Sequence, residues 1–199
     1  QQRLESSIGH RFDAAAMDAF LAAHASDEAS LKAGLRQLRS WVVCHLAIRD
    51  LLGLAPLGEV TETMTLLAER TLLHAHRVLI APLIARHGQP LDGDGAPLEL
   101  IVVGMGKLGG RELNVSSDID LIFVYPEDGE TRGERPLSHF DFFTRLGRQI
   151  IAALSEISSD GFVFRVDMRL RPNGDSGPLV SSFDALENYF IVQGREWER

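Results

Sequence analysis

Asp118 and Asp120 are the two residues whose type and spacing most directly suggest chemistry. They stand two positions apart at the start of an apolar run, so on a strand both carboxylates would project from the same face. Two ionised carboxylates side by side repel each other, and a hard divalent cation such as Mg²⁺ could hold them together with substrate phosphate oxygens. The alternative is that one or both are solvated acids at the edge of a strand.

Asp167 offers a third carboxylate, on a later alternating stretch between Arg165 and Arg169. If its strand neighbours the strand of the aspartate pair, three carboxylates converge. Such a set can hold two metal ions that clamp the attacking and leaving oxygens of an in-line phosphoryl displacement. The basic residues here, with Arg171, could balance the charge of a phosphate or could form salt bridges with the same aspartates.

The stretch GMGKLGG at 104–110 lies between an apolar run and the aspartate pair. The consecutive glycines Gly109 and Gly110 would let the backbone approach a phosphate closely with exposed N–H groups. Ser116 and Ser117, directly before the first aspartate, add hydroxyl donors. Together with the carboxylates, these residues indicate phosphate chemistry.

The same stretch contains G-x-G-x-x-G, so a dinucleotide site is an alternative. Only about 14 residues separate the first strand, ending near Val103, from the next, which is short for a crossover helix. A ribose-binding acid should follow the glycines by about 20 residues, at the far end of the second strand, where Glu127 or Asp128 could serve. The spacing therefore disfavours this alternative but leaves it open.

Other reactive side chains give weaker indications. Cys44 is the single cysteine, which excludes an internal disulfide, and its helical context predicts a buried structural thiol. His74 and His76 point to different sides of a helix and do not form a zinc pair. The seven histidines are expected at the surface or the edge of the core. Neither a G-x-S-x-G elbow nor a Walker P-loop occurs.

Two helices are expected before the strands. The first begins at a cap on Ser26 or Asp27 and ends before Gly53. Its apolar residues recur at three- and four-residue spacing: Leu31, Leu35, Leu38, Val42, Leu46 and Leu52. The second is expected from about Val60 to Arg86, although Pro82 suggests an earlier break or kink. Its apolar face would comprise Leu66, Leu67, Thr71, Leu73, Val78 and Leu79.

Strand spacing replaces helical spacing after the turn-rich QPLDGDGAP. Leu98–Val103 is a compact apolar strand, Asp118–Tyr125 alternates between two faces, and Phe162–Met168 alternates again. Between the second and third strands, Ser138 and Asp141 form a capping box that opens a helix. The expected inner face of that helix is Phe143, Leu146, Ile150 and Leu154.

Composition and charge narrow the class of protein. The 199 residues have a formal net charge of −8 and a pI near 5.3, which argues against a sequence-independent nucleic-acid binder. No apolar run approaches the roughly 18 residues needed to cross a bilayer, and the first residues do not form a signal peptide. We expect a cytoplasmic protein that has no nucleic-acid or membrane partner.

The stretches GMGKLGGRELNVSSDIDLIFVY and DGFVFRVDMRLRPNGDSGPLVSS resemble the bacterial glutamine synthetase adenylyltransferase/adenylyl-removing enzymes of the DNA polymerase β-like nucleotidyltransferase superfamily. The resemblance implies an α+β fold in which residues 58–182 form a nucleotidyltransferase core, a small mixed sheet with helices. A helical region, 1–57, would precede the core, and 183–199 would start a following helical region. Because the chain begins without Met and ends inside an amphipathic segment, it is expected to be a fragment.

Proteins of that family carry two nucleotidyltransferase domains. The amino-terminal domain removes AMP from a tyrosine of glutamine synthetase by phosphorolysis, releasing ADP, and the carboxy-terminal domain attaches AMP from ATP. Gly104-Met105-Gly106, ELNVSSDIDLIF and RPNGDSGPLV resemble the amino-terminal half. The implied function is Mg²⁺-dependent deadenylylation that regulates nitrogen metabolism, within a multifunctional, ATP-binding enzyme. The alternatives are the adenylylating half, which releases pyrophosphate, and a nucleotide-binding regulatory domain.

Carried over by position, the resemblance makes Asp118, Asp120 and Asp167 the catalytic carboxylates and the ligands of two Mg²⁺ ions. Phosphate and nucleotide contacts are implied for Gly109, Gly110, Ser117, Lys107, Arg169 and Arg171, although the three cations could instead fix loop structure. The implied partners are adenylylated glutamine synthetase, phosphate, adenine nucleotide and, through the full-length enzyme, a nitrogen-signalling PII-type protein.

Overall fold

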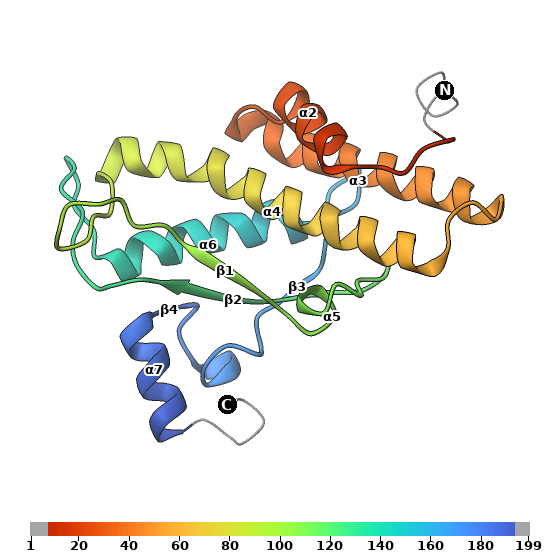
Figure 1. The fold of residues 1–199 in the computed structure, drawn as a ribbon. Helices are drawn as coiled ribbons and strands as arrows, with labels where there is room; N and C mark the ends of the chain where they lie inside the picture. The colour runs from red at the N-terminus through yellow and green to blue at the C-terminus, as the bar shows by residue number, and fades with distance from the viewer. Residues whose placement is uncertain (1–7, 194–199) are drawn as a thin grey trace. The chain divides into compact units, whose positions relative to one another are not determined.

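A computed structural model describes residues 8–193 and has an α+β fold, a small mixed sheet flanked by helices (Figure 1). The predicted fold class is confirmed. In chain order the elements are α2 (Ala14–His24), α3 (Glu28–Leu51), α4 (Leu57–His87), β1 (Ile101–Met105), α5 (Gly106–Gly109), β2 (Ile119–Tyr125), α6 (His139–Ser155), β3 (Val166–Asp167), the 3₁₀ turn η1 (Gly174–Ser176), β4 (Val180–Ser182) and α7 (Phe183–Val192). Among the described residues, no helix combines the length and apolarity that a membrane crossing requires.

The chain forms two compact units, each assembled from segments that are far apart in the sequence. The first unit contains the described residues up to Val78 together with Gly106–Ile119 and Ile150–Val166. The second contains Leu79–Met105, Asp120–Gln149 and the described residues from Asp167 onward.

Helix α3 begins as the sequence predicts. Asp27 is its N-cap: the carboxylate accepts from the Ser30 backbone N–H at 2.8 Å, and the Ser30 hydroxyl accepts from the Asp27 N–H at 3.3 Å. Five of the six predicted apolar residues are buried: Leu31, Leu35, Leu38, Val42 and Leu46. Leu52 is 60% exposed, so its predicted place on this face is wrong, because the helix ends at Leu51.

Helix α4 is one helix that continues through Pro82 to His87, so a break at the proline is a wrong prediction. The buried residues recur at helical spacing and include Met64, Leu67, Ala68, Thr71, Leu72, Ala75 and Leu79. Leu73, expected on this face, is 57% exposed, because the neighbouring Leu72 occupies the inward position. The predicted end is confirmed: Gly88 follows the helix with φ +86°.

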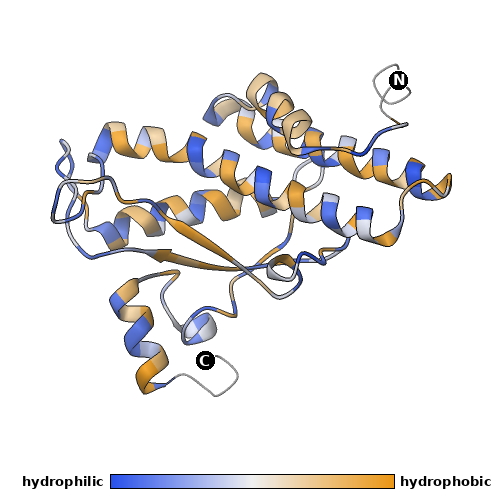
Figure 2. Ribbon diagram, in the orientation of Figure 1, coloured by the Kyte–Doolittle hydropathy of each residue, from blue (hydrophilic) through white to orange (hydrophobic). Residues whose placement is uncertain are grey.

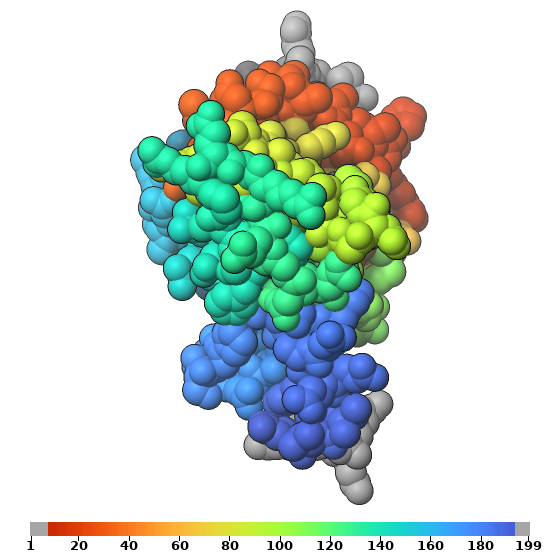
Figure 3. All heavy atoms as spheres, turned by 90° about the vertical axis from the view of Figure 1, so that its left-hand side faces the viewer, coloured from red at the N-terminus to blue at the C-terminus, as the bar shows by residue number. Residues whose placement is uncertain are grey.

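The end of α4 meets the loop that follows β2, inside the second unit. The Gly133 N–H donates to the His87 carbonyl at 2.9 Å, and His87 Nδ1 lies 2.7 Å from the Arg135 carbonyl. A Cβ on Gly133 would lie 2.2 Å from the His87 carbonyl carbon, so only glycine permits this approach. Figure 3 shows these yellow-green and blue-green segments side by side on one face.

The sheet is built around β2. Strand β1 pairs antiparallel with β2, from Met105 opposite Asp120 to Ile101 opposite Val124. On the other side of β2, strand β4 pairs parallel with its last three residues. Both long strands are apolar (Figure 2). Every residue of β2 except Asp120 is buried, including Ile122 and Val124. The predicted two-faced alternation is therefore wrong, because both faces of this inner strand are covered.

Strand β3, the third neighbour in the sheet order, is shorter than predicted. Of the expected Phe162–Met168, only Val166–Asp167 is a strand. The backbone N–H groups of Val163 and Phe164 donate instead to the Leu154 carbonyl, at 2.8 and 3.1 Å. These residues therefore cap the end of α6 rather than extend the sheet.

Helix α6 covers β2 in the second unit. Its predicted start is confirmed, since the Ser138 hydroxyl accepts from the Asp141 N–H at 3.0 Å and donates to the Asp141 carboxylate at 2.9 Å. The four predicted inner residues are fully buried: Phe143, Leu146, Ile150 and Leu154. The Phe143 ring stacks on Tyr125 of β2, with 5.2 Å between ring centroids.

Gly147 lies where α6 packs closely against β2. A Cβ there would lie 2.8 Å from Cδ2 of Phe123, a ring that is 1% exposed and has no room to move. We expect Gly147→Ala to destabilise the chain by about 1–3 kcal/mol, measured by urea unfolding. Gly58→Ala, also in a helix but with open space around the new methyl group, is the control and should be neutral or stabilising. Equal stabilities of the two variants would contradict this packing.

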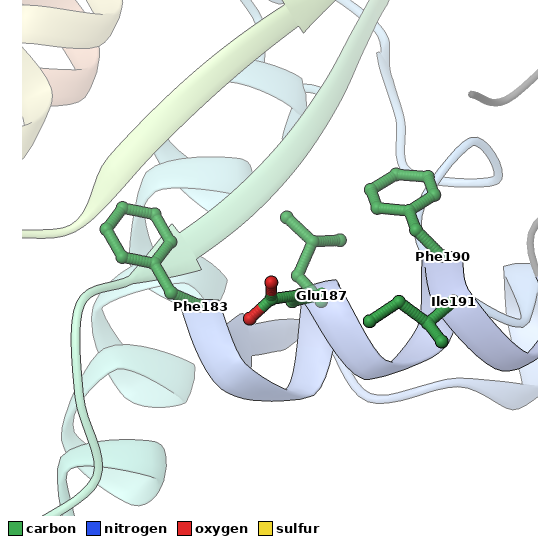
Figure 4. A pocket seen from close by; sticks show the side chains of 5 residues that line it. Phe183, Glu187, Phe190 and Ile191 are labelled. Atoms are coloured by element: carbon green, nitrogen blue, oxygen red, sulfur yellow. The ribbon is translucent and has the colours of Figure 1, made fainter.

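Helix α7 begins at Phe183 and is capped by Ser182, whose hydroxyl accepts from the Ala185 N–H at 3.3 Å. One side of the helix is apolar and lines a cavity of about 710 Å³, where Figure 4 shows Phe183, Phe190 and Ile191 with the carboxylate of Glu187. The predicted helical region after 182 is thus helical to Val192, and 194–199 lie outside the described residues.

Candidate functional site

Asp120 and Asp167 come from neighbouring strands of the second unit, β2 and β3. Asp167 is largely buried, with 16% of its side chain exposed. Arg169 forms bidentate hydrogen bonds with its carboxylate: Nε lies 3.0 and 2.9 Å from the two carboxylate oxygens, and Nη2 lies 2.5 Å from Oδ2. The Arg169 backbone N–H also donates to Asp167, at 2.8 Å. The structure thus brings together two predicted carboxylates and one predicted phosphate-binding cation.

This arrangement fixes the charge of Asp167. The side-chain hydrogen bonds from Arg169, followed by its backbone N–H, hold the pKa of the Asp167 carboxyl below its ordinary value, although burial opposes them. The Arg169 guanidinium has a raised pKa, chiefly through Asp167 and to smaller degrees through Asp175 and then Asp120. Arg169 therefore interacts electrostatically with both candidate acids, Asp167 and Asp120, and stays charged beside them.

Asp118 lies in the first unit, one residue before β2. Arg165 donates to its carboxylate through Nε and to the Ser116 carbonyl through Nη2 at 3.1 Å. The Arg165 and Asp118 side chains are 62% and 44% exposed, so solvent screens this pair. For Asp118 and Asp167, the structure shows the salt bridges that the sequence had left as an alternative.

The second part of the glycine-rich stretch, residues 106–110, forms a compact turn in the first unit, whereas Gly104 and Met105 belong to β1. Gly106 opens α5 with φ +52°, and Gly110 N–H donates back to the Gly106 carbonyl at 2.9 Å. Gly109, Gly110 and Lys107 are all exposed. A Cβ on Gly110 would meet only the Gly106 carbonyl oxygen, at 3.4 Å, so internal packing does not require glycine there.

The strand directions exclude a dinucleotide fingerprint. That motif joins two parallel strands through a crossover helix, whereas β1 and β2 are antiparallel and the helix between them has four residues. Helix α5 is too short to cross the sheet. The G-x-G-x-x-G pattern is therefore a turn between antiparallel strands.

Ser117 closes the segment that precedes the aspartate pair. Its backbone N–H donates to the Asn114 carbonyl at 3.2 Å, and its hydroxyl oxygen accepts from the Asn114 N–H at 3.3 Å. A hydroxyl that accepts one bond can donate another. Arg39 of α3, which neither its type nor its spacing marks as a site residue, donates from Nη2 to the Val115 carbonyl at 3.1 Å. Its only signature in the sequence is a charged residue beside the apolar face of α3.

Arg171 fixes the loop after β3. Only 13% of its side chain is exposed, and it donates to the carbonyls of Met168, Asp175 and Gly177 at 2.7, 3.4 and 3.5 Å. Asn173 turns this loop with φ +61°. The structure therefore shows the loop-fixing role for Arg171, and its contact with phosphate stays a prediction.

Within 8–193, no three His, Cys, Asp or Glu side chains are grouped so that they could hold a metal ion. Arginines bind two of the candidate carboxylates instead. Carboxylate oxygens are nevertheless the donor type that Mg²⁺ prefers, and it needs only one or two of them alongside phosphate oxygens. The residues thus fit Mg²⁺ by donor type, and the shared three-carboxylate site stays a prediction.

Two expectations about reactive side chains are wrong. Cys44 is exposed, because it lies off the α3 face formed by Leu38, Val42 and Leu46. Four histidines are buried rather than at the surface or the edge of the core: His45, His74, His87 and His139. Each lies close to a backbone carbonyl, as His74 Nε2 does to Ala25 O at 2.7 Å, so hydrogen bonding offsets the cost of burial.

A family model described as glutamate-ammonia ligase adenylyltransferase matches residues 2–199. The chain is 64% identical over 197 residues to the bifunctional glutamine synthetase adenylyltransferase/adenylyl-removing enzyme of Aromatoleum aromaticum, a match that covers 99% of this chain and 21% of the relative. The enzymes of the same name in Ralstonia nicotianae and Chromobacterium violaceum are 59% and 55% identical, over 98% and 100% of this chain and 20% and 22% of theirs. The chain thus spans about a fifth of the length of these curated relatives.

Proposed function

Because the chain belongs to the glutamate-ammonia ligase adenylyltransferase family, we propose that it is the deadenylylating nucleotidyltransferase domain, which removes AMP from a tyrosine of glutamine synthetase by phosphorolysis and forms ADP. The relatives' name contains two activities, adenylyl transfer and adenylyl removal, and the chain corresponds to about a fifth of their length. The observation that carries the proposal is the group formed by Asp120, Asp167 and Arg169, two carboxylates on neighbouring strands of a small mixed sheet with a cation that interacts electrostatically with both.

We choose the adenylyl-removing activity because of the amino-acid sequences of three motifs. Gly104-Met105-Gly106, ELNVSSDIDLIF and RPNGDSGPLV resemble the amino-terminal half of the family. Glutamine synthetase as the substrate follows from the relatives' name, and a nitrogen-signalling PII-type partner follows from the family resemblance alone.

Asp118, Asp120 and Asp167 would hold Mg²⁺, two ions in this proposal. Bound there, the metal supplies positive charge that neutralises the phosphates and helps the tyrosine oxygen to leave. For the carboxylates to serve as ligands, Arg165 and Arg169 have to release them. Both side chains are well exposed, Arg165 at 62% and Arg169 at 72%, so their guanidinium groups can turn toward the charge of a bound phosphate.

The glycine turn would hold inorganic phosphate or the AMP phosphate. Gly109 and Gly110 present exposed backbone without side chains, and Lys107 adds a positive charge. The Ser117 hydroxyl can donate a further bond. These groups would orient the phosphate for in-line attack on the adenylyl phosphorus, and orientation accounts for much of the rate in reactions of this kind.

The deciding experiment compares two reactions of the intact enzyme. With adenylylated glutamine synthetase, inorganic phosphate and Mg²⁺, we expect this domain to form ADP. The second reaction uses unmodified glutamine synthetase and ATP, with the other nucleotidyltransferase domain of the intact enzyme inactivated. In that reaction this domain should release no pyrophosphate. Pyrophosphate without ADP would identify the adenylylating half, and nucleotide binding without turnover would identify a regulatory domain.

Gly110→Ala separates phosphate binding from folding. Because the φ of Gly110 is outside the left-handed region and its new Cβ would make only an ordinary contact, the melting temperature should be unchanged. A methyl group at a surface that contacts phosphate should raise the KM for phosphate about tenfold, measured as ADP formation. Gly58→Ala is the control for activity as well. An unchanged KM for phosphate would remove Gly110 from the phosphate site.

A further inference from the structure

The segment 113–118, which leads to the aspartate pair, is held from three sides within the first unit. Leu113 is buried, and its N–H donates to the Thr65 hydroxyl of α4 at 3.4 Å. Arg39 of α3 holds the Val115 carbonyl. Arg165 holds the Ser116 carbonyl as well as Asp118. This connection therefore depends on side chains from distant parts of the chain rather than on regular secondary structure.

Of the two arginines, Arg39 is the less exposed. Its guanidinium carbon lies 5.1 Å from the ring centroid of Phe164 and 5.7 Å from that of Phe162. Its Nη1 is buried without a hydrogen-bond partner among the described residues, so the group is kept in place by the rings and by the Val115 carbonyl. Burial, and next the charge of Arg165, lower the pKa of Arg39. Such a costly placement indicates a requirement for this cation.

Arg165, in contrast, is exposed to solvent. It donates one hydrogen bond to the Asp118 carboxylate and another to the Ser116 carbonyl. If Asp118 becomes a metal ligand, Arg165 has to release that carboxylate. The hydrogen bond from Arg39 to the Val115 carbonyl does not involve Asp118, so release of the Asp118 carboxylate by Arg165 does not break it.

We infer that Arg39 is a positioning residue of the nucleotidyl-transfer site: through the Val115 carbonyl it holds the 113–118 backbone while Arg165 exchanges between Asp118 and a phosphate, an inference that rests on the proposed function. Arg39 does not touch the reacting atoms. It determines where the Ser117 hydroxyl and the Asp118 carboxylate lie when metal and phosphate bind. A small displacement of such groups lowers the rate steeply.

The test compares Arg39→Met with Arg36→Met. Arg36 lies on the same helix, is 3% exposed and donates to the carbonyls of Lys32, Glu156 and Gly161, so it stabilises the same unit without contacting the segment. In the intact enzyme, Arg39→Met should lower kcat for ADP formation about ten- to a hundredfold. It should also raise the Mg²⁺ concentration needed for half-maximal rate several-fold, with the KM for adenylylated glutamine synthetase unchanged. Arg36→Met should lower the melting temperature without changing the Mg²⁺ dependence.

A second measurement is independent of the reaction. Hydrogen exchange of peptides covering 111–120, followed by mass spectrometry without metal, should be faster in Arg39→Met at the amides of Ser117 and Ile119, which are hydrogen-bonded in the structure. Arg36→Met should leave these amides at the wild-type rate. If the wild-type enzyme forms no ADP, the proposed function is wrong, and this exchange still decides whether Arg39 holds the segment.

Three results would overturn the inference: unchanged exchange in Arg39→Met, faster exchange with wild-type kcat and Mg²⁺ dependence, or equal shifts of Mg²⁺ dependence in both methionine variants. If either methionine variant does not fold, the corresponding lysine variant replaces it. Arg39→Lys keeps the charge over the rings but not the planar donor fork, so its kcat should lie between those of wild type and a variant without the cation.

Discussion

Asp120→Asn is expected to lower ADP formation by the intact enzyme about a hundredfold or more. Asparagine keeps the size of the side chain but removes the negative charge that a divalent cation needs. Loss of one group that stabilises charge in a transition state typically costs that much in kcat. Asp118→Asn and Asp167→Asn should give losses of the same order, measured as ADP released from adenylylated glutamine synthetase.

The controls for this experiment address charge and folding. Asp160→Asn removes an exposed acid in the turn closed by Ser158 and Gly161, outside the strands that carry the candidate carboxylates, and should leave ADP formation unchanged. Melting curves should show that Asp120→Asn folds, because Asp120 is the one residue of β2 that is not buried. Wild-type rates in the Asp118 and Asp120 variants would refute the metal-ligand assignment.

Glu59→Gln is expected to destabilise the chain by about 3–5 kcal/mol, the typical cost of leaving one member of a buried ion pair without its partner. Glu59, at the start of α4, has 2% of its side chain exposed, and Arg49, near the end of α3, has 7%. Arg49 Nε and Nη2 donate to the two Glu59 oxygens at 2.7 and 3.1 Å. Without the carboxylate, the Arg49 charge stays buried between the helices.

Urea unfolding measures this loss, and Glu62→Gln is the matched control. Glu62 is 65% exposed and lies 3.8 Å from Arg11, so its removal should cost less than about 1 kcal/mol. Similar losses in both glutamine variants would show that the Arg49–Glu59 pair does not stabilise the packing of α3 against α4.

The same pair makes stability depend on pH in a defined direction. The hydrogen bonds from Arg49, ahead of its charge and that of Arg11, lower the pKa of Glu59 from its ordinary value of 4.5, against the effect of burial. A lowered pKa means that the folded state disfavours protonation. The contribution of the pair is therefore complete above pH 4.5 and is lost as the pH falls below that value. The stability difference between wild type and Glu59→Gln should narrow over that acid range.

Local signals in the sequence predicted much of the secondary structure correctly. The caps at Asp27 and Ser138, the end of α4 before Gly88 and the inner face of α6 all match the structure. Each depends on residues within a few positions of one another, so the sequence encodes it directly. The aspartates and glycines of the candidate site were also identified from their types and spacing, as was Arg169.

Only the tertiary structure decided which side chains meet. The Arg165–Asp118 pair joins residues 47 positions apart, and the Arg39–Val115 bond joins residues 76 positions apart. It also decided that β2 is buried on both faces, that β3 is short and that Cys44 is exposed. Burial and pairing depend on which segments pack together, and the periodicity of one segment does not specify its neighbours. The sequence by itself therefore determined the candidate carboxylates, the candidate cation Arg169 and the helix caps, whereas tertiary packing determined which side chains meet at the site and which are buried.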